Sequence, residues 1–216
     1  FGSYDGGSAA DTYTINGTQS VALDGGLGDD MFSLANGASH TSMIRGGGGT
    51  DTIAFAGTTA EVITLSSNSF RGMSTSVTSF SNIDAIDGTG LDTLSGLGGT
   101  AGTFNLNTGG NTYQAGGNTL AFSGIANLVG SSRSDIFNVT GAHPVSIDAR
   151  NGNDQIILLT DASNLTGTID GGTGSVDVFD LSNLTIGRTI DSTSLTNIEV
   201  LLGTSGNDTL AGSAAG

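Results

Sequence analysis

The chain has 216 residues, of which 37 are glycine and one is proline, and it contains no cysteine and no lysine. Its formal net charge of −15 repels nucleic-acid phosphates and anionic lipid, so composition argues against nucleic acid as a partner and against a membrane surface. The longest run of large apolar residues, 156–159, is far too short to span a bilayer, which argues against membrane insertion. Without cysteine, neither disulfides nor thiolate chemistry contributes.

One phrase recurs along the chain: a glycine-rich turn, an aspartate, a spacer and a large apolar residue. In chain order its copies occupy residues 6–13, 25–32, 46–53, 88–94, 130–137, 150–156, 171–179 and 203–210. The shortest intervals between successive aspartates of the phrase are 19, 21, 19 and 23 residues. Self-similarity at this spacing predicts a stacked repeat fold, with about 20 residues in each coil.

Strand signals accompany each copy. The pairs that follow the aspartates alternate with small or polar residues, which puts one face of each strand in a core; they are Tyr13 and Ile15, Phe32 and Leu34, Ile53 and Phe55, Phe137 and Val139, and Phe179 and Leu181. A second strand precedes the glycines, at 21–26, 42–47, 145–150 and 167–172. We therefore expect an all-β fold, a right-handed parallel β-solenoid of the β-helix or β-roll kind.

The phrases also repeat at a longer period. Asp11, Asp30 and Asp51 recur as Asp135, Asp154 and Asp177, at offsets of 124, 124 and 126 residues. This predicts one continuous solenoid segment over residues 1–216. Its first super-repeat covers 1–95, joint coils cover 96–121, and a second super-repeat covers 122–216. We expect the segment to belong to a longer array.

The phrases at 25–32 and 46–53 both match G-G-x-G-x-D-x-U in full, where U is a large apolar residue. This pattern resembles the RTX, or haemolysin-type, calcium-binding repeat family. Glycine permits the positive φ angles of a tight turn, and aspartate adds a hard oxygen ligand. The resemblance implies Ca²⁺ between the two stacked turns, held by Gly25, Gly26, Gly28, Asp30, Gly46, Gly47, Gly49 and Asp51.

The sequence departs from the family pattern in one respect. Family nonapeptides run back to back, whereas these phrases lie about 20 residues apart, so one side of each coil carries the turn. The alternative to calcium is that the aspartates and glycines bond to the backbone and stack as a ladder without metal.

Residues 195–212, LTNIEVLLGTSGNDTLAG, and the longer coils are similar to giant repetitive bacterial surface adhesins, including filamentous-haemagglutinin-like proteins. This resemblance implies a structural segment of an extracellular or cell-surface stalk or filament. Its partners would be neighbouring repeats, copies joined end to end, or a host or surface glycan or protein. Two alternatives remain open: a calcium-dependent folding and secretion module of a secreted enzyme or toxin, and a self-assembling filament subunit.

Signals for catalysis are weak. The chain has no G-x-S-x-G or H-E-x-x-H motif, and every prominent aspartate belongs to the repeat. His40 and His143 stand in loop-like sequence, and we expect both to be solvated. We therefore predict no enzymatic activity, no catalytic residue and no organic cofactor.

Overall fold

The computed structural model describes residues 2–67 and 70–212. Within these ranges the protein is all-β, with 21 strands in one mostly parallel sheet, two further strand pairs and one short 3-10 helix, η1 (Ser192–Ser194). The all-β prediction and the parallel pairing are thus confirmed. None of the described residues forms a helix of the length and apolarity needed to cross a membrane.

The strands are short, and turns separate successive strands. In the first half they are β1 (Ser3–Asp5), β2 (Thr12–Ile15), β3 (Thr18–Gln19), β4 (Ala22–Leu27), β5 (Met31–Leu34), β6 (Ser39–Gly48), β7 (Thr52–Phe55), β8 (Val62–Ser67), β9 (Arg71–Met73), β10 (Val77–Ser81) and β11 (Ala85–Ser95). They continue with β12 (Thr103–Leu106), β13 (Asn111–Ala115), β14 (Asn118–Val129), β15 (Ile136–Val139), β16 (Ala142–His143), β17 (Ser146–Asp148), β18 (Gln155–Leu158), β19 (Asn164–Leu165) and β20 (Ile169–Asp170). The last are β21 (Val178–Asp180), β22 (Thr189–Asp191), β23 (Leu195–Thr196), β24 (Val200–Leu202) and β25 (Thr209–Ala211).

The chain forms two compact units. Unit 1 comprises residues 1–97 and 114–126, and unit 2 comprises residues 98–113 and 127–216. Each unit is described separately below. The boundaries of the super-repeats and of the joint coils come from the sequence alone, and they stay a prediction.

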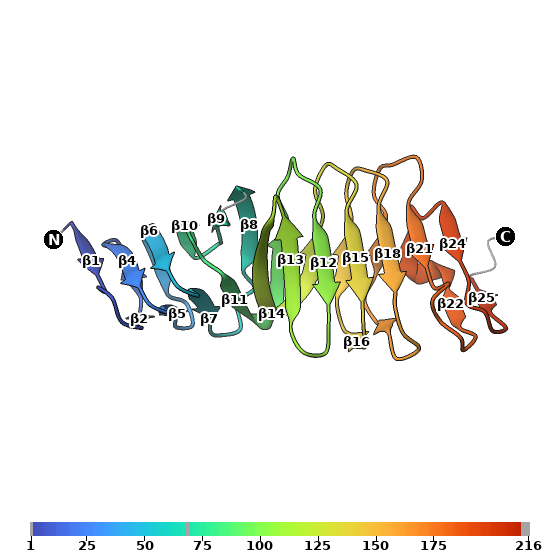
Figure 1. Cartoon of the computed structure of the whole chain (residues 1–216), viewed down its shortest axis with the longest axis horizontal. Helices are drawn as coiled ribbons and strands as arrows, with labels where there is room; N and C mark the ends of the chain where they lie inside the picture. Colours follow the sequence, from blue (N-terminus) through green and yellow to red (C-terminus); the bar gives the residue numbers. More distant parts are fainter. Residues whose placement is uncertain (1, 68–69, 213–216) are drawn as a thin grey trace. The chain divides into compact units, whose positions relative to one another are not determined.

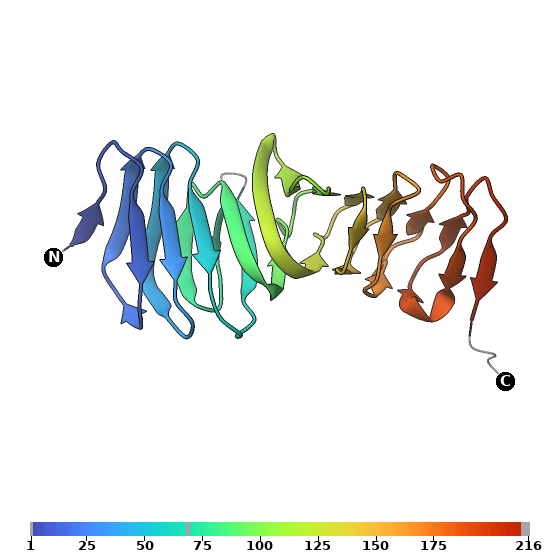
Figure 2. The ribbon, with the colours of Figure 1, turned by 90° about the horizontal axis from the view of Figure 1, so that it is seen from below.

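In unit 1, strands one repeat apart lie side by side and run parallel. The strands β2, β5, β7 and β11 pair in this order, with Tyr13 opposite Phe32, Phe32 opposite Ile53, and Ile53 opposite Ile86. A second row joins β1, β4, β6 and β10, and Figure 2 shows the successive strands of this unit in blue to green. Each repeat thus contributes one strand before its glycine turn and one after it.

Unit 2 follows the same plan. The strands β12, β15, β18, β21 and β24 pair in parallel and stand in a row in Figure 1. The strands that precede the turns form a second row of β17, β20 and β23. Strands that lie one repeat apart in the sequence are therefore paired neighbours in the sheet.

The core of each unit consists of the inward-facing positions of these strands. In β5, Phe32 and Leu34 are buried while Met31 is exposed, as the period-two alternation predicted. Equivalent aromatic side chains stack from one repeat to the next: the ring centroids of Tyr13 and Phe32 lie 4.9 Å apart. This distance matches the spacing of paired strands, so a parallel sheet brings identical positions into contact.

One strand breaks the parallel pattern. β9 runs antiparallel to both β8 and β10 in unit 1. The interval between Asp51 and Asp92 is longer than the shortest repeats, and its extra residues include β9, which folds back on the sheet. Gly72 in β9 is required there, because a Cβ atom would lie 2.5 Å from the ring of Phe80 and 2.6 Å from the carbonyl oxygen of Thr64.

Candidate functional site

The aspartates of the repeated phrase form a ladder in unit 1. The backbone N–H of Asp11 donates to Asp30 Oδ1 at 2.8 Å, and that of Asp30 donates to Asp51 Oδ1 at 2.9 Å. The N–H of Asp51 donates to Asp84 Oδ2 at 3.0 Å. Each carboxylate therefore satisfies the backbone of the repeat before it, and a hydrogen bond to a charged group contributes roughly 1.5–3 kcal/mol.

The same ladder exists in unit 2. The N–H groups of Asp135 and Asp154 donate to the Oδ1 atoms of Asp154 and Asp177, at 2.6 and 2.7 Å. The N–H of Asp177 donates to Glu199 Oε2 at 2.8 Å. Sequence inspection located the aspartates, but it missed Glu199, which lacks the glycine-rich context. The outer members of the ladder can thus be other acids.

A second set of aspartates shapes the entrance to several of the turns. In unit 1, Asp24 Oδ1 accepts the N–H of Gly26 at 3.3 Å. In unit 2, Asp148 accepts the N–H of Arg150 at 3.1 Å, and Asp170 accepts that of Gly172 at 2.9 Å. These are Asx turns, in which the side chain replaces a backbone acceptor. In these repeats the aspartate before the glycines therefore bonds within its own turn, whereas the aspartate after the glycines bonds to the neighbouring repeat.

The glycines of the predicted calcium phrase are explained by close stacking. A Cβ atom on Gly25 would lie 2.1 Å from Asp30 Oδ2 and 2.4 Å from the carbonyl oxygen of Gly46. Gly46 is confined in the same way, with Asp51 Oδ2 at 2.4 Å from its Cβ position. Gly26, Gly28, Gly47 and Gly49 have φ angles of 94°, 113°, 117° and 132°, which side chains of L-residues rarely adopt.

The structure brings the two predicted calcium turns together, since Gly26 pairs with Gly47 and Leu27 with Gly48. Oδ1 of each aspartate belongs to the ladder, and the carbonyl oxygen of Gly48 accepts the N–H of Gly28, whereas Oδ2 of Asp30 and of Asp51 is buried without a hydrogen-bond partner. Among residues 2–67 and 70–212, no three acidic or histidine side chains gather as metal ligands. Because Ca²⁺ requires six to eight oxygens, these residues fit the ladder better than a shared ion, and calcium here stays a prediction.

Burial disfavours the charged form of Asp51, one of the carboxyl groups of the ladder. Asp51 is fully buried, and this burial raises the pKa of its carboxyl, as do the neighbouring carboxylates of Asp30, Asp84 and Asp29, while the hydrogen bond from the backbone of Asp30 lowers it. A ladder of like charges is therefore stacked in a region that disfavours charge.

Arg150 is a strained member of the turn series in unit 2. It has a φ angle of 70° at the position that glycine occupies in the next repeat, where Gly172 has a φ of 86°. A left-handed residue with a side chain costs about 1–2 kcal/mol, part of which glycine loses again to chain entropy. We expect Arg150→Gly to stabilise unit 2 by about 0.5–1 kcal/mol, measured by urea denaturation.

Arg133 provides the matched control for this substitution. It is also exposed and lies in the preceding turn, but its φ angle is not positive. Arg133→Gly should therefore lower stability slightly through chain entropy alone. A loss of stability in Arg150→Gly as large as that in Arg133→Gly would contradict the assignment of strain.

One acid outside the ladder, Glu61, makes structural contacts with a turn. Glu61 is buried in unit 1, where its Oε2 accepts the N–H of Ser76 at 2.9 Å and its Oε1 accepts the Ser76 hydroxyl. Its own N–H donates to Asp92 Oδ1 at 2.7 Å. Both carboxylate oxygens are thus occupied by one turn. No sequence signal marked Glu61, because it lies outside the glycine phrases.

The prediction of solvated histidines is wrong for His40. This residue lies in β6 rather than in a loop, and its side chain is fully buried, with its pKa lowered by that burial. The alternation of β6 places its side chain inward, a pattern that the polar neighbours in the sequence concealed. His143 lies in β16 and is half-buried, with Nε2 3.1 Å from the carbonyl oxygen of Thr140.

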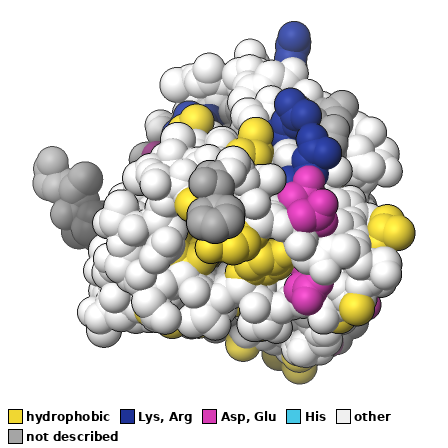
Figure 3. Space-filling view, turned by 90° about the vertical axis from the view of Figure 1, so that its left-hand side faces the viewer, with side chains coloured by type: hydrophobic (Ala, Val, Ile, Leu, Met, Phe, Trp, Pro, Cys, Tyr) yellow, Lys and Arg dark blue, Asp and Glu magenta, His cyan; other side chains and the backbone are white. Residues whose placement is uncertain are grey.

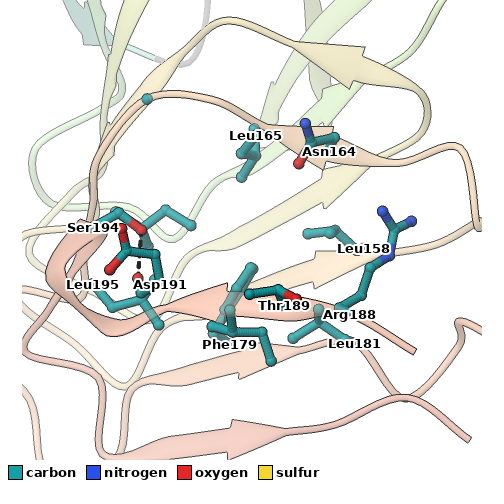
Figure 4. Close-up of a pocket in the computed structure, with 13 residues that line it drawn as sticks. Leu158, Asn164, Leu165, Phe179, Leu181, Arg188, Thr189, Asp191, Ser194 and Leu195 are labelled. Carbon is teal, nitrogen blue, oxygen red and sulfur yellow. Dashed lines mark hydrogen bonds between the residues drawn. The ribbon is translucent and has the colours of Figure 1, made fainter. Parts of the chain in front are cut away.

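A cavity of about 210 Å³ lies in unit 2, and Figure 4 shows its lining. The lining combines apolar side chains such as Leu158 and Phe179 with polar ones such as Asp191 and Ser194. Arg188 is on its rim, where its guanidinium donates to the carbonyl oxygens of Asp161 and Ser163. The Ser194 hydroxyl donates to the backbone carbonyl oxygen of Asp191 at 2.8 Å, so the contacts of Arg188 and Ser194 hold backbone segments together.

No protein-family model, curated protein or solved structure matches this chain. Its function is therefore inferred from the geometry of its repeats alone.

Proposed function

We propose that this chain is a non-enzymatic structural segment of an extracellular or bacterial-surface stalk or filament. In this proposal the repeats of each unit wind as a right-handed parallel β-solenoid. The handedness follows from the strong preference of parallel β-crossovers for the right-handed connection. Each added repeat would extend the array by one strand spacing, about 4.8 Å. Neighbouring repeats would be its main partners, and a surface glycan or protein would be a ligand of the complete molecule.

The observation that carries this proposal is the aspartate ladder. In both units the most regularly placed acids use an oxygen to accept the backbone N–H of the preceding repeat. Such contacts stabilise the stacking of repeats, which is the property an extending segment needs. An active site would instead direct its acids at a cavity, and none of the ladder acids lines the cavity in unit 2.

A self-assembling filament subunit is the second candidate, and the first repeat of unit 1 favours it. A groove of about 350 Å³ there exposes apolar side chains, including Tyr4, and is also lined by the half-buried Tyr13 and Val21. Figure 3 views this side of the protein and shows hydrophobic side chains clustered near acidic and basic ones. Another repeat stacked on this end would cover them, whether from the same polypeptide or from a second copy.

One experiment separates the three functions. The chain should be melted by circular dichroism in excess calcium and then in chelator, and its mass followed by sedimentation over a range of concentrations. The structural segment predicts equal melting temperatures and a constant mass. A large stabilisation by calcium would favour the secretion module, since a ligand of the folded state raises the melting temperature. Growth of mass with concentration would favour the filament subunit.

A further inference from the structure

The ladder of unit 2 places acids in a buried column. The carboxylate of Asp154 faces Asp135, which precedes β15, and Asp177, which precedes β21. Asp177 in turn faces Glu199 and Asp170. Asp135, Asp154 and Asp177 are each at most 1% exposed. Three carboxyl groups thus lie one repeat apart, where water does not screen their repulsion.

The second oxygens of this column differ in their partners. Asp135 Oδ2 accepts the N–H of Ser131 at 2.6 Å. In contrast, Oδ2 of Asp154 and Oδ2 of Asp177 are buried and have no hydrogen-bond partner. An ionised oxygen without a partner is costly to bury, and a buried group in this position normally becomes neutral. Within this column the geometry therefore marks Asp154 and Asp177 as acids that disfavour the charged form, a feature that Asp11, Asp30 and Asp51 share in unit 1.

No cation compensates this charge within the described part of unit 2. Arg133 and Arg150, which lie in the adjacent turns, have exposed side chains and form no ion pair with these acids. The guanidinium of Arg188 is committed to backbone carbonyl oxygens. The ion pair found within residues 2–67 and 70–212 is Arg45 with Asp24, in unit 1.

The turn of Asp154 also carries a methyl group where the corresponding turns have glycine. Ala149 occupies the position of Gly25 and Gly171 in the other turns, as shown by its place directly after Asp148, and it is fully buried. Its methyl group replaces a hydrogen atom in the densest part of the turn. The pKa of Asp154 is raised to about 7, first by burial and then by the carboxylates of Asp135 and Asp177, while the hydrogen bond from the backbone of Asp135 acts in the opposite direction.

We propose that folded unit 2 binds a proton at Asp154 near neutral pH, so that its repeats are more stable in mildly acidic than in alkaline solution. The proton comes from solvent and resides on the carboxyl group, while Oδ1 continues to accept the N–H of Asp135. This inference does not depend on the proposed function, because it concerns the stacking of repeats whatever they carry.

The direction of the effect follows from linkage. The folded state holds the proton more tightly than the unfolded chain, whose aspartate has the ordinary pKa of 3.8. The stabilisation is therefore complete below about pH 4 and is lost as the pH rises through about 7. Burial raises the pKa of Asp135 and of Asp177 as well, so both act in the same direction. The pKa values of Asp161, Asp191 and Asp208 are lowered, so these groups change the stability only at pH values below this window.

The test is hydrogen exchange of the whole chain between pH 4.5 and 8, resolved by residue and corrected for the intrinsic pH dependence of exchange. Residue resolution separates unit 2 from unit 1, where buried His40 has the opposite dependence. For one proton, the folding equilibrium constant of unit 2 should fall by up to about tenfold per pH unit. In Asp154→Asn, which keeps an oxygen acceptor, this slope should decrease by one proton. Asp148→Asn, an exposed acid of the same turn, should leave the slope unchanged.

A second measurement tests the proposal even if Asp154→Asn does not fold. The carboxyl carbon of Asp154 in the unaltered chain can be titrated by NMR, and we expect its midpoint near pH 7. Both experiments should be run in chelator and again with calcium. A midpoint below pH 5, or an unchanged slope in folded Asp154→Asn, would overturn the proposal. A midpoint that falls below pH 5 only with calcium would also overturn it, because a metal ion would then hold that oxygen.

Discussion

Gly26→Ala should cost unit 1 about 3–5 kcal/mol, because it combines backbone strain with a collision between repeats. The φ angle of Gly26 is 94°, and an added Cβ would lie 2.2 Å from the carbonyl oxygen of Gly7 and 2.9 Å from its nitrogen. Both atoms belong to the backbone of the preceding turn, so no side chain can rotate away. Loss of hydrogen-exchange protection over residues 12–55 would measure the effect.

Gly7→Ala is the matched control for this prediction. Gly7 occupies the same position in the preceding turn and has a φ angle of 101°, but an added Cβ would have no atom within 4 Å. It should therefore cost only the backbone term, about 1–2 kcal/mol. If the two substitutions were equally costly, strain within the turn rather than stacking between repeats would explain the recurring glycines.

Phe137→Ala should destabilise unit 2 by about 3–5 kcal/mol. Phe137 is fully buried, and its ring stacks on that of Phe104 with centroids 4.8 Å apart and an interplanar angle of 1°. Alanine would leave a cavity between two repeats and would remove the aromatic contact, which itself contributes about 0.5–1.5 kcal/mol. Urea denaturation followed by circular dichroism gives the change in free energy of unfolding.

The neighbouring residue in the same strand serves as its control. Ile136 points outward from β15 and is 37% exposed, so Ile136→Ala should cost about 1 kcal/mol or less. Phe137→Leu, which retains most of the apolar volume, should lie between the two. A small effect of Phe137→Ala would mean that the stacked rings are not part of the cooperative core of unit 2.

The sequence predicted the repeat positions well because spacing alone determines them. In a parallel sheet, residues that recur at equal intervals become neighbours, and Tyr13, Phe32 and Ile53 do so. The role of the aspartates could not be predicted in the same way. A calcium loop and a hydrogen-bonded ladder both need positive-φ glycines and a short carboxylate. Only atomic positions show that Asp30 Oδ1 faces the N–H of Asp11.

Other features of the structure could not be predicted from local sequence patterns. His40 is flanked by serine and threonine, which resembles a loop, although its β-strand directs it into the core. The antiparallel β9 lies in a repeat that lacks an aspartate anchor, so spacing could not locate it. Glu61 and Glu199 replace aspartate without the glycine turn. In each case the surrounding three-dimensional contacts, rather than the local residues, determine the structure.

The ladder also has a direction. Within each unit, a repeat gives an amide to the carboxylate of the repeat that follows it in the chain, and the reverse contact does not occur among these aspartates. One end of such an array therefore offers a carboxylate, and the other offers a backbone amide. Two arrays can continue one another head to tail with every amide matched to an acid. Joined tail to tail, they would bring amide against amide, so the chemistry of a single side chain gives the array a polarity.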